Sequence, residues 1–186
     1  MADETAPAPS GFAPYYYARL AFNIARWDDV SIRRASRDSK AGVYGAFFWA
    51  ISVTILLFFT LIPQVQRAED LSRPASIIGL AIGLLFALVA MAILTVAQLG
   101  LCHLIAKWLL SATGTFAAVM RPLLLGWFVN LLILIPVIGQ LAAAIAWIAV
   151  LMLVFEEVDG ISRLQAFLIS AIVNVSFLFL QFAILP

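Results

Sequence analysis

Residues 76–110 read SIIGLAIGLLFALVAMAILTVAQLGLCHLIAKWLL, and this stretch decides the class of fold. It carries no charged residue before Lys107. A helix crosses the hydrocarbon core of a bilayer with about 20 apolar residues, whereas these 35 residues would extend about 52 Å at 1.5 Å per residue. We therefore predict one long helix that projects beyond the membrane, in preference to two short spans joined near Gln98-Leu99-Gly100.

The composition of the whole chain agrees with a membrane protein. Of 186 residues, 65% are apolar and 11% are charged, against roughly 45–50% and about 25% in soluble domains. A soluble monomer must cover its surface with polar groups, so this composition excludes soluble enzymes, nucleic-acid-binding domains and disordered chains. The net charge of +1 also argues against nucleic acid as a partner, because phosphate binding needs a concentrated basic face.

The predicted fold class is all-α: a polytopic membrane helix bundle with five transmembrane helices and an N-terminal interfacial amphipathic helix. Backbone groups in lipid must bond within their own segment, which favours helices, and the period-2 alternation of a membrane barrel is absent. The transmembrane domain is residues 41–186. Its spans are expected at about 43–62, 76–110, 116–135, 137–155 and 164–185, with Pro63 closing the first and Pro136 the third.

The first forty residues divide into two parts. Residues 1–14 are rich in Ala and Pro and predict a disordered tail without the pattern of a signal peptide. Residues 15–40 interleave aromatic and charged residues and predict a helix on the inner leaflet, with an apolar stripe of Leu20, Ile24 and Trp27 opposite an arginine face. Anionic lipid would attract that face, and a docking site for a soluble partner is the alternative.

Lysine and arginine set the orientation. With the N-terminus inside, nine of the eleven basic residues lie on the inner side and two, Arg67 and Arg73, on the outer side. This places the N-terminus in the cytoplasm and the C-terminus outside. The inner nine are Arg19, Arg26, Arg33, Arg34, Arg37, Lys40, Lys107, Arg121 and Arg163.

Three carboxylates, Glu156, Glu157 and Asp159, gather at the inner end of the fourth span. Carboxylates at a helix C-terminus oppose the helix dipole, so neighbouring cations should compensate them. A juxtamembrane network of ion pairs is the preferred interpretation. A cation site or a contact with a partner is the alternative.

His103 is the only histidine, and Cys102 is the only cysteine. One cysteine excludes an internal disulfide and a Cys-based metal cluster, and a lone histidine beside it lacks the ligand count of a zinc site. A proton relay would need carboxylates within the spans, and none is expected there. We interpret His103 as a structural residue at the membrane interface and predict no cofactor, metal or catalytic residue.

Small residues repeat every four positions at Ala75, Gly79, Gly83 and Ala87, which allows a neighbouring helix to approach closely. Packing within the chain is the preferred interpretation, with a second chain as the alternative. Polar uncharged residues within the spans are expected to form interhelical hydrogen bonds. They are Gln98, Asn130, Asn174 and Gln181.

The order of several motifs resembles the Yip-domain family of five-span membrane proteins, named for their interaction with Ypt/Rab GTPases. A Lys-containing helix end (Lys107), a Gly-Thr-Phe turn (114–116) and Arg121 follow one another as in family members. The turn Glu157-Val158-Asp159-Gly160-Ile161-Ser162 is similar to the family's Glu-Val-His-Gly-Leu/Ile-Ser, with Asp159 in place of the frequent His. At the first span, residues 43–49 (VYGAFFW) look like the eukaryotic members' Asp-Leu-Tyr-Gly-Pro-Phe-Trp pattern, without its Asp and Pro.

The resemblance implies an N-cytoplasmic, five-span helical protein and, for eukaryotic members, vesicle trafficking through Rab-type GTPases and like family members. The short N-terminal region and the nine Arg against two Lys look more like a bacterial member in the inner membrane. The expected function is that of a non-enzymatic membrane scaffold or interaction protein working through its cytoplasmic face. An accessory subunit of a larger, bioenergetic membrane complex is the first alternative, and a small-molecule or ion transporter is the second.

The expected partners are the lipid bilayer, other membrane proteins or like subunits, and a cytoplasmic protein. The interaction candidates are Arg19, Arg26, Trp27, Arg33, Arg34, Lys107, Arg121, Glu156, Glu157, Asp159 and Arg163, and the helix-packing candidates are Gly79, Gly83 and Ala87.

Overall fold

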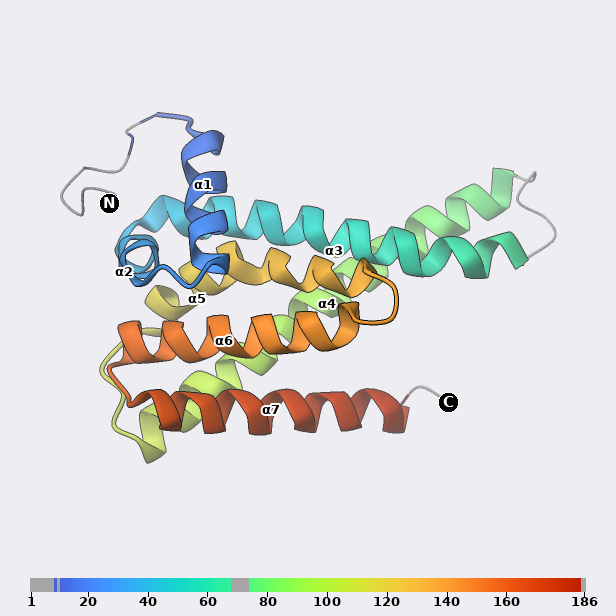
Figure 1. The fold of residues 1–186 in the computed structure, drawn as a ribbon. Helices are drawn as coiled ribbons and strands as arrows, with labels where there is room; N and C mark the ends of the chain where they lie inside the picture. The colour runs from blue at the N-terminus through green and yellow to red at the C-terminus, as the bar shows by residue number, and fades with distance from the viewer. Residues whose placement is uncertain (1–8, 10, 68–73, 185–186) are drawn as a thin grey trace.

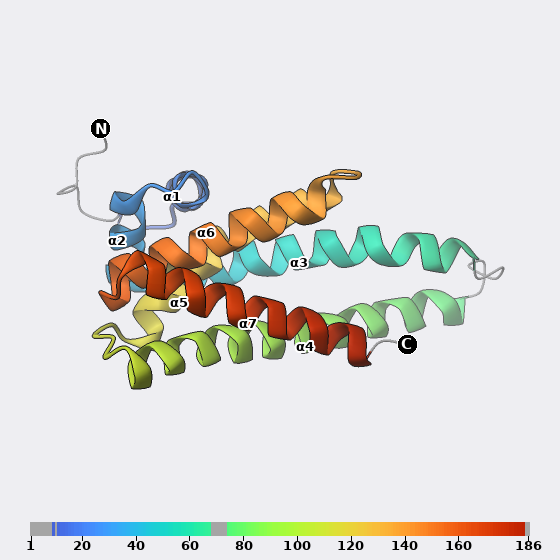
Figure 2. The ribbon, with the colours of Figure 1, turned by 60° about the horizontal axis from the view of Figure 1, so that its bottom comes forward.

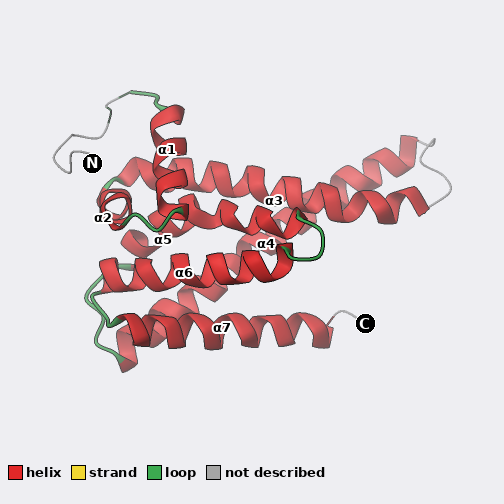
Figure 3. Cartoon of the chain, viewed as in Figure 1, coloured by secondary structure: helices red, strands yellow, loops and turns green. Residues whose placement is uncertain are grey.

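The computed structural model describes the backbone of residue 9, residues 11–67 and residues 74–184. Every regular element in this part of the chain is helical (Figure 3). The predicted tail at 1–14 lies almost wholly outside the described residues, as do Arg73 and the side chains of Arg67, Ala75 and Gln181. The elements are α1 (Pro14–Ala25), α2 (Asp29–Arg37), α3 (Ser39–Arg67), α4 (Pro74–Leu109), α5 (Phe116–Gly126), η1 (Trp127–Leu134), α6 (Gly139–Asp159) and α7 (Arg163–Ile184).

Four helical segments are long and apolar enough to cross a membrane, which indicates an integral membrane protein. They are Ser39–Thr60, Ile78–Leu109, Phe116–Leu134 and Gly139–Asp159. The described apolar part of α7, Arg163–Phe177, is shorter. The all-helical class and the multi-pass character predicted from the sequence are therefore confirmed.

The long helices lie side by side in a bundle, and α1 crosses them near one end (Figure 1). At the opposite end α3 and α4 extend together beyond the other helices (Figures 1 and 2). The prediction that residues 76–110 form one helix is confirmed, because α4 is unbroken over 36 residues. Gln98 Nε2 donates to Asn174 Oδ1 at 2.7 Å and joins α4 to α7, as expected of polar residues inside apolar spans.

The third span ends at Leu134, just before Pro136 as predicted, whereas the first continues past its proline. The first span was expected to close at Pro63, but α3 continues to Arg67, because a helix in lipid has no other partners for its backbone groups. The third span changes character at Trp127, where α5 gives way to the 3-10 helix η1. Asn130 Nδ2 donates to the Trp127 carbonyl at 2.8 Å, so it bonds within its own segment rather than across helices.

The N-terminal segment forms two helices instead of the single predicted one. The chain turns at Trp27, whose φ is 66°, and Asp28 caps α2 by accepting a hydrogen bond from the Ser31 amide at 3.0 Å. The predicted lipid-facing stripe is wrong for Leu20 and Ile24, which are buried inside the protein, whereas Trp27 is 54% exposed. These two side chains are covered by protein because α1 packs on the bundle.

The best-packed region lies where α1, α5 and α6 meet. Ile24, Leu123, Val150 and Phe155 are fully buried there. Gly126 allows this approach, because a Cβ atom at its position would lie 3.0 Å from both Ile24 Cγ2 and Val150 Cγ1. The absence of a side chain at Gly126 therefore allows both α1 and α6 to pack closely against α5.

The small-residue face of α4 makes no such contact among the described residues. No described atom lies within 4 Å of a Cβ built on Gly79 or Gly83, and Ala87 is half-buried. The interpretation of this face as internal packing therefore stays a prediction. Only 6% of the apolar part of α4 is buried, against 44% for Phe116–Leu134, because α4 lies at the edge of the bundle.

Replacing Gly126 with leucine is expected to destabilise the protein by about 1–3 kcal/mol, the usual cost of overpacking a closely packed core. The new side chain has to displace Ile24 and Val150. Thermal unfolding in detergent, followed by circular dichroism, measures the effect. Gly83→Leu is the matched control and is expected to change stability little, because no described atom lies near Gly83. Equal losses in the two variants would contradict the packing role of Gly126.

Candidate functional site

One end of the bundle collects most of the described charged side chains. It comprises α1 and α2, the segment from Lys107 to Arg121, and the turn from Glu156 to Arg163, and it is called the charged end below (Figure 1, left). The sequence candidates from the N-terminal region and from the two later segments thus meet at one place.

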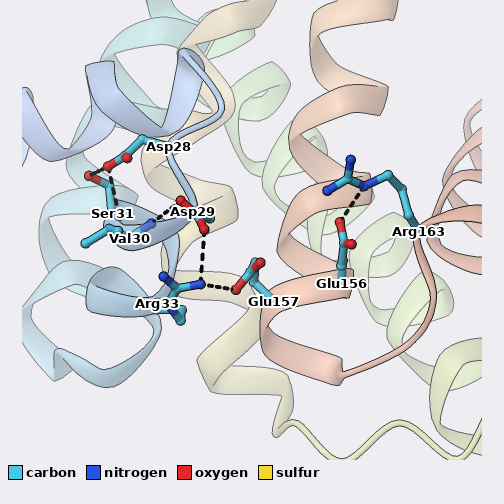
Figure 4. Close-up of polar contacts among 8 residues, drawn as sticks. All are labelled: Asp28, Asp29, Val30, Ser31, Arg33, Glu156, Glu157 and Arg163. Atoms are coloured by element: carbon cyan, nitrogen blue, oxygen red, sulfur yellow. Dashed lines mark hydrogen bonds and ion pairs between the residues drawn. The ribbon is translucent and has the colours of Figure 1, made fainter. Parts of the chain in front are cut away.

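Arg33 joins α2 to the end of α6 (Figure 4). Its NH1 atom lies 2.5 Å from Glu157 Oε2 and 3.2 Å from Asp29 Oδ2, so one guanidinium bridges two carboxylates. Arg33 and Glu157 are 29% and 21% exposed, which shields the pair from solvent more than an ordinary surface ion pair. The hydrogen bond to Glu157 raises the pKa of Arg33, so the guanidinium stays charged.

Glu156 has a different cationic partner, Arg163, across the turn between α6 and α7 (Figure 4). Arg163 Nε lies 2.8 Å from Glu156 Oε2, and the arginine side chain is 64% exposed. An exposed pair of this kind contributes about 0–1 kcal/mol, because water and salt screen it. This pair sets the local shape of the turn more than the stability of the bundle.

Asp159 is fully buried and pairs with His103 of α4, at 3.1 Å between Oδ2 and Nδ1. Its backbone carbonyl accepts from the Thr113 amide at 3.0 Å. Its second carboxylate oxygen has no hydrogen-bond partner among the described residues and faces Gly114, where any Cβ would collide with it. The last residue of α6 is thus bonded to the segment that follows α4.

Two further cations at the charged end, Arg121 and Lys107, bond to backbone carbonyls. Arg121 NH1 donates to the Ser36 carbonyl at 2.7 Å and ties α5 to the end of α2. Lys107 Nζ donates to the Gly114 carbonyl at 3.4 Å. The carboxylates of Glu156, Glu157 and Asp159 are thus directed to separate partners, and the described residues contain no group of three His, Cys, Asp or Glu side chains that could hold a metal ion.

Tyr17 fastens α1 to the start of α3. Its hydroxyl donates to Asp38 Oδ2 at 2.6 Å, and its ring stacks on Tyr44 with 4.0 Å between ring centroids. Burial and the nearby Asp38 carboxylate raise the pKa of Tyr17, so the phenol keeps its proton and remains a donor. The Tyr44 hydroxyl in turn accepts from the Ala13 amide at 2.9 Å.

The other N-terminal candidates lie at the surface of this end. Trp27 is 54% exposed, and the Arg26 guanidinium lies over the Phe22 ring at 5.7 Å from its centroid. Arg19 and Arg34 line a small cavity between α1 and α2. These residues therefore form part of the surface of the charged end.

Sequence reasoning missed the pairing of His103 with Asp159. It placed His103 at the interface near Lys107 and found no carboxylate for it. The sequence feature that could have indicated this pair is Asp159-Gly160. Gly160 adopts φ 69° and ends α6, so the chain turns back toward α4 at this point.

The chain was compared with protein-family models, with curated proteins and with solved structures, and no match was found in any of the three.

The Arg33–Glu157 pair is expected to contribute about 1.5–3 kcal/mol of coupling energy, the usual range for charged hydrogen bonds with partial burial. A double-mutant cycle with Arg33→Ala and Glu157→Ala, read by thermal unfolding in detergent, measures it. The Arg163→Ala and Glu156→Ala cycle is the control and should give no more than about 1 kcal/mol. A weaker coupling for Arg33–Glu157 than for Arg163–Glu156 would refute the link between α2 and α6.

His103→Leu is expected to destabilise the protein by about 1–3 kcal/mol, because it leaves the buried Asp159 carboxyl oxygen without its hydrogen-bond partner. The double variant His103→Leu with Asp159→Leu should recover much of this loss, since no buried charge remains. Unfolding midpoints of the three proteins test the pair. A double variant that is less stable than His103→Leu would show that Asp159 is held by other groups.

Proposed function

We propose that this chain is a non-enzymatic integral membrane protein of the scaffold or interaction type, acting through its charged end on the cytoplasmic side. The observation that carries the proposal is the fixed docking of the N-terminal helices. Ile24 and Ile32 are fully buried, and Arg33 is bonded to Glu157. A surface already held in one conformation loses little conformational entropy when a partner binds.

The proposed topology has five spans, with α7 as the fifth, an N-terminus in the cytoplasm and a C-terminus outside. Helix α7 has 22 residues, about 33 Å at 1.5 Å per residue, which matches a hydrocarbon core of about 30 Å. Lys107, Arg121 and Arg163 lie at the same end as α2, in keeping with the positive-inside rule. A bacterial inner membrane is the proposed location.

Helix α1 is proposed to lie in the membrane interface. It crosses the bundle axis (Figure 1), and its outer side exposes aromatic rings: Tyr15 is 80% and Phe22 54% exposed. Aromatic rings prefer the level of the lipid headgroups. Arg26 beside Phe22 adds attraction to anionic lipid.

The Yip-domain resemblance belongs to this proposal and implies a cytoplasmic partner protein or like subunits. The turn that carries the closest motif has a physical need for its glycine, since Gly160 has φ 69°. Asp159, which stands where the family frequently has His, is buried against His103. The motif thus occupies the junction of α4, α6 and α7 at the charged end.

A second candidate function, an accessory subunit of a larger membrane complex, is favoured by α4. Its side chains Ile82, Leu85 and Phe86 are more than half exposed, and Gly83 has open space beside it. Small residues next to an open helix face suit close helix–helix contact in a membrane. A neighbouring subunit would cover this face.

Photo-cross-linking in intact cells tests both functions. The full chain carries benzoylphenylalanine at one of three exposed positions: Trp27 at the charged end, Phe86 on α4 or Val137 at the opposite end. We expect protein adducts with a cytoplasmic or membrane partner from position 27, and none from position 137. Val137 is fully exposed, so it controls for accessibility alone.

The other outcomes decide between the functions. Protein adducts from position 86 alone, with cofactor-bearing subunits among them, would favour the accessory subunit. Adducts to lipid only, or recovery of an uncross-linked monomer from all three positions, would contradict the interaction function. Cytoplasmic partners captured from position 137 would overturn the proposed orientation.

A further inference from the structure

We propose that the cleft between α1 and α2 binds the phosphate group of an anionic lipid headgroup. The cleft has a volume of about 180 Å³ and is open to the surface. It exists because the chain turns sharply at Trp27 and Asp28 starts α2, which sets the two short helices at an angle. The inference deepens the proposed interfacial position of α1 and rests on it.

The polar part of the cleft suits an oxyanion. Arg19 approaches from α1 and Arg34 from α2, and Asn23 adds an amide group. The lining residues include no Asp or Glu, and the Asp28 carboxylate beside the cleft already accepts hydrogen bonds from the Ser31 amide and hydroxyl. Arginine guanidinium groups bind phosphate oxygens in pairs, with charge-assisted hydrogen bonds.

The apolar part of the cleft favours a lipid over a free phosphate ion. Leu20, Val30 and the Tyr16 side chain line it together with the arginines. A phospholipid presents a phosphate joined to glycerol and acyl carbons, which can bury their apolar surface against these side chains. Inorganic phosphate has no group for them. The exposed aromatic rings of Tyr15 and Phe22 on the same helix belong at the headgroup level, where such a lipid is present.

Binding is measured by native mass spectrometry of the full chain in detergent, with phosphatidylglycerol and, separately, phosphatidylcholine. We expect wild-type protein to retain phosphatidylglycerol preferentially and Arg19→Gln with Arg34→Gln to weaken that binding at least about tenfold, as loss of charged hydrogen bonds predicts. The matched control is Arg37→Gln with Arg163→Gln, which removes the same charge from the charged end outside the cleft and should keep the preference.

Val30→Trp fills the cleft without changing any charge and is expected to abolish the preference as well. Its folding is checked by thermal unfolding, and a photoactivatable phosphatidylglycerol on wild-type protein should cross-link within residues 16–34. The position of these cross-links on wild-type protein tests lipid binding in the cleft even if a variant does not fold.

Three results would overturn the inference. Equal losses in the two arginine pairs would indicate diffuse attraction of lipid to a basic surface. Displacement of phosphatidylglycerol by millimolar inorganic phosphate, with binding of that ion to the cleft, would make a soluble anion the ligand. Cross-links outside residues 16–34 would place the lipid elsewhere. A chain that captures a partner from position 27 but shows no lipid preference keeps the proposed function and loses only this inference.

Discussion

The close approach of Ile24 and Val150 to Gly126 is the constraint on which the charged end depends. It holds α1 against α5 and α6, and the turn at Trp27 then directs α2 toward the end of α6. Only in that position can Arg33 reach Glu157, which is 124 residues away in the sequence. A close helix contact without polar atoms therefore controls where the charged groups meet.

The charged groups in turn are graded by their burial. Asp159 is fully buried and bonded to His103, Arg33 and Glu157 are partly covered, and Arg163 is mostly exposed. Interaction strength falls along this series as exposure to water increases, and so does the cost of losing a partner. The inner pairs thus hold the helix ends together, while the outer charges remain at the surface, where a partner or a lipid headgroup can bind them.

The helical class, the multi-pass character and the unbroken helix α4 were predictable because each follows from local composition and length. The burial of Leu20 and Ile24 was not, since an apolar stripe at helical spacing looks the same whether lipid or protein covers it. The spacing of glycines in the sequence likewise does not predict which of them makes a close helix contact. The regular repeat at Gly79 and Gly83 has no described neighbour within 4 Å outside its own helix, whereas the isolated Gly126 makes the close contact. The His103–Asp159 pair was also not predictable, because 56 residues separate its members and only the tertiary structure brings them together.

The N-terminal segment therefore has two sides with different partners. The side chains of Tyr17, Leu20 and Ile24 pack against the bundle. Protein already buries these three side chains, so they do not need lipid for burial. This leaves Tyr15, Phe22 and Trp27, with Arg26, on the outside. An interfacial helix that is held by protein does not depend on the membrane for its structure, so in the proposed topology its arginines meet headgroups in a fixed geometry. A free amphipathic helix would select for charge alone, whereas a fixed cleft can also select for the shape of the headgroup.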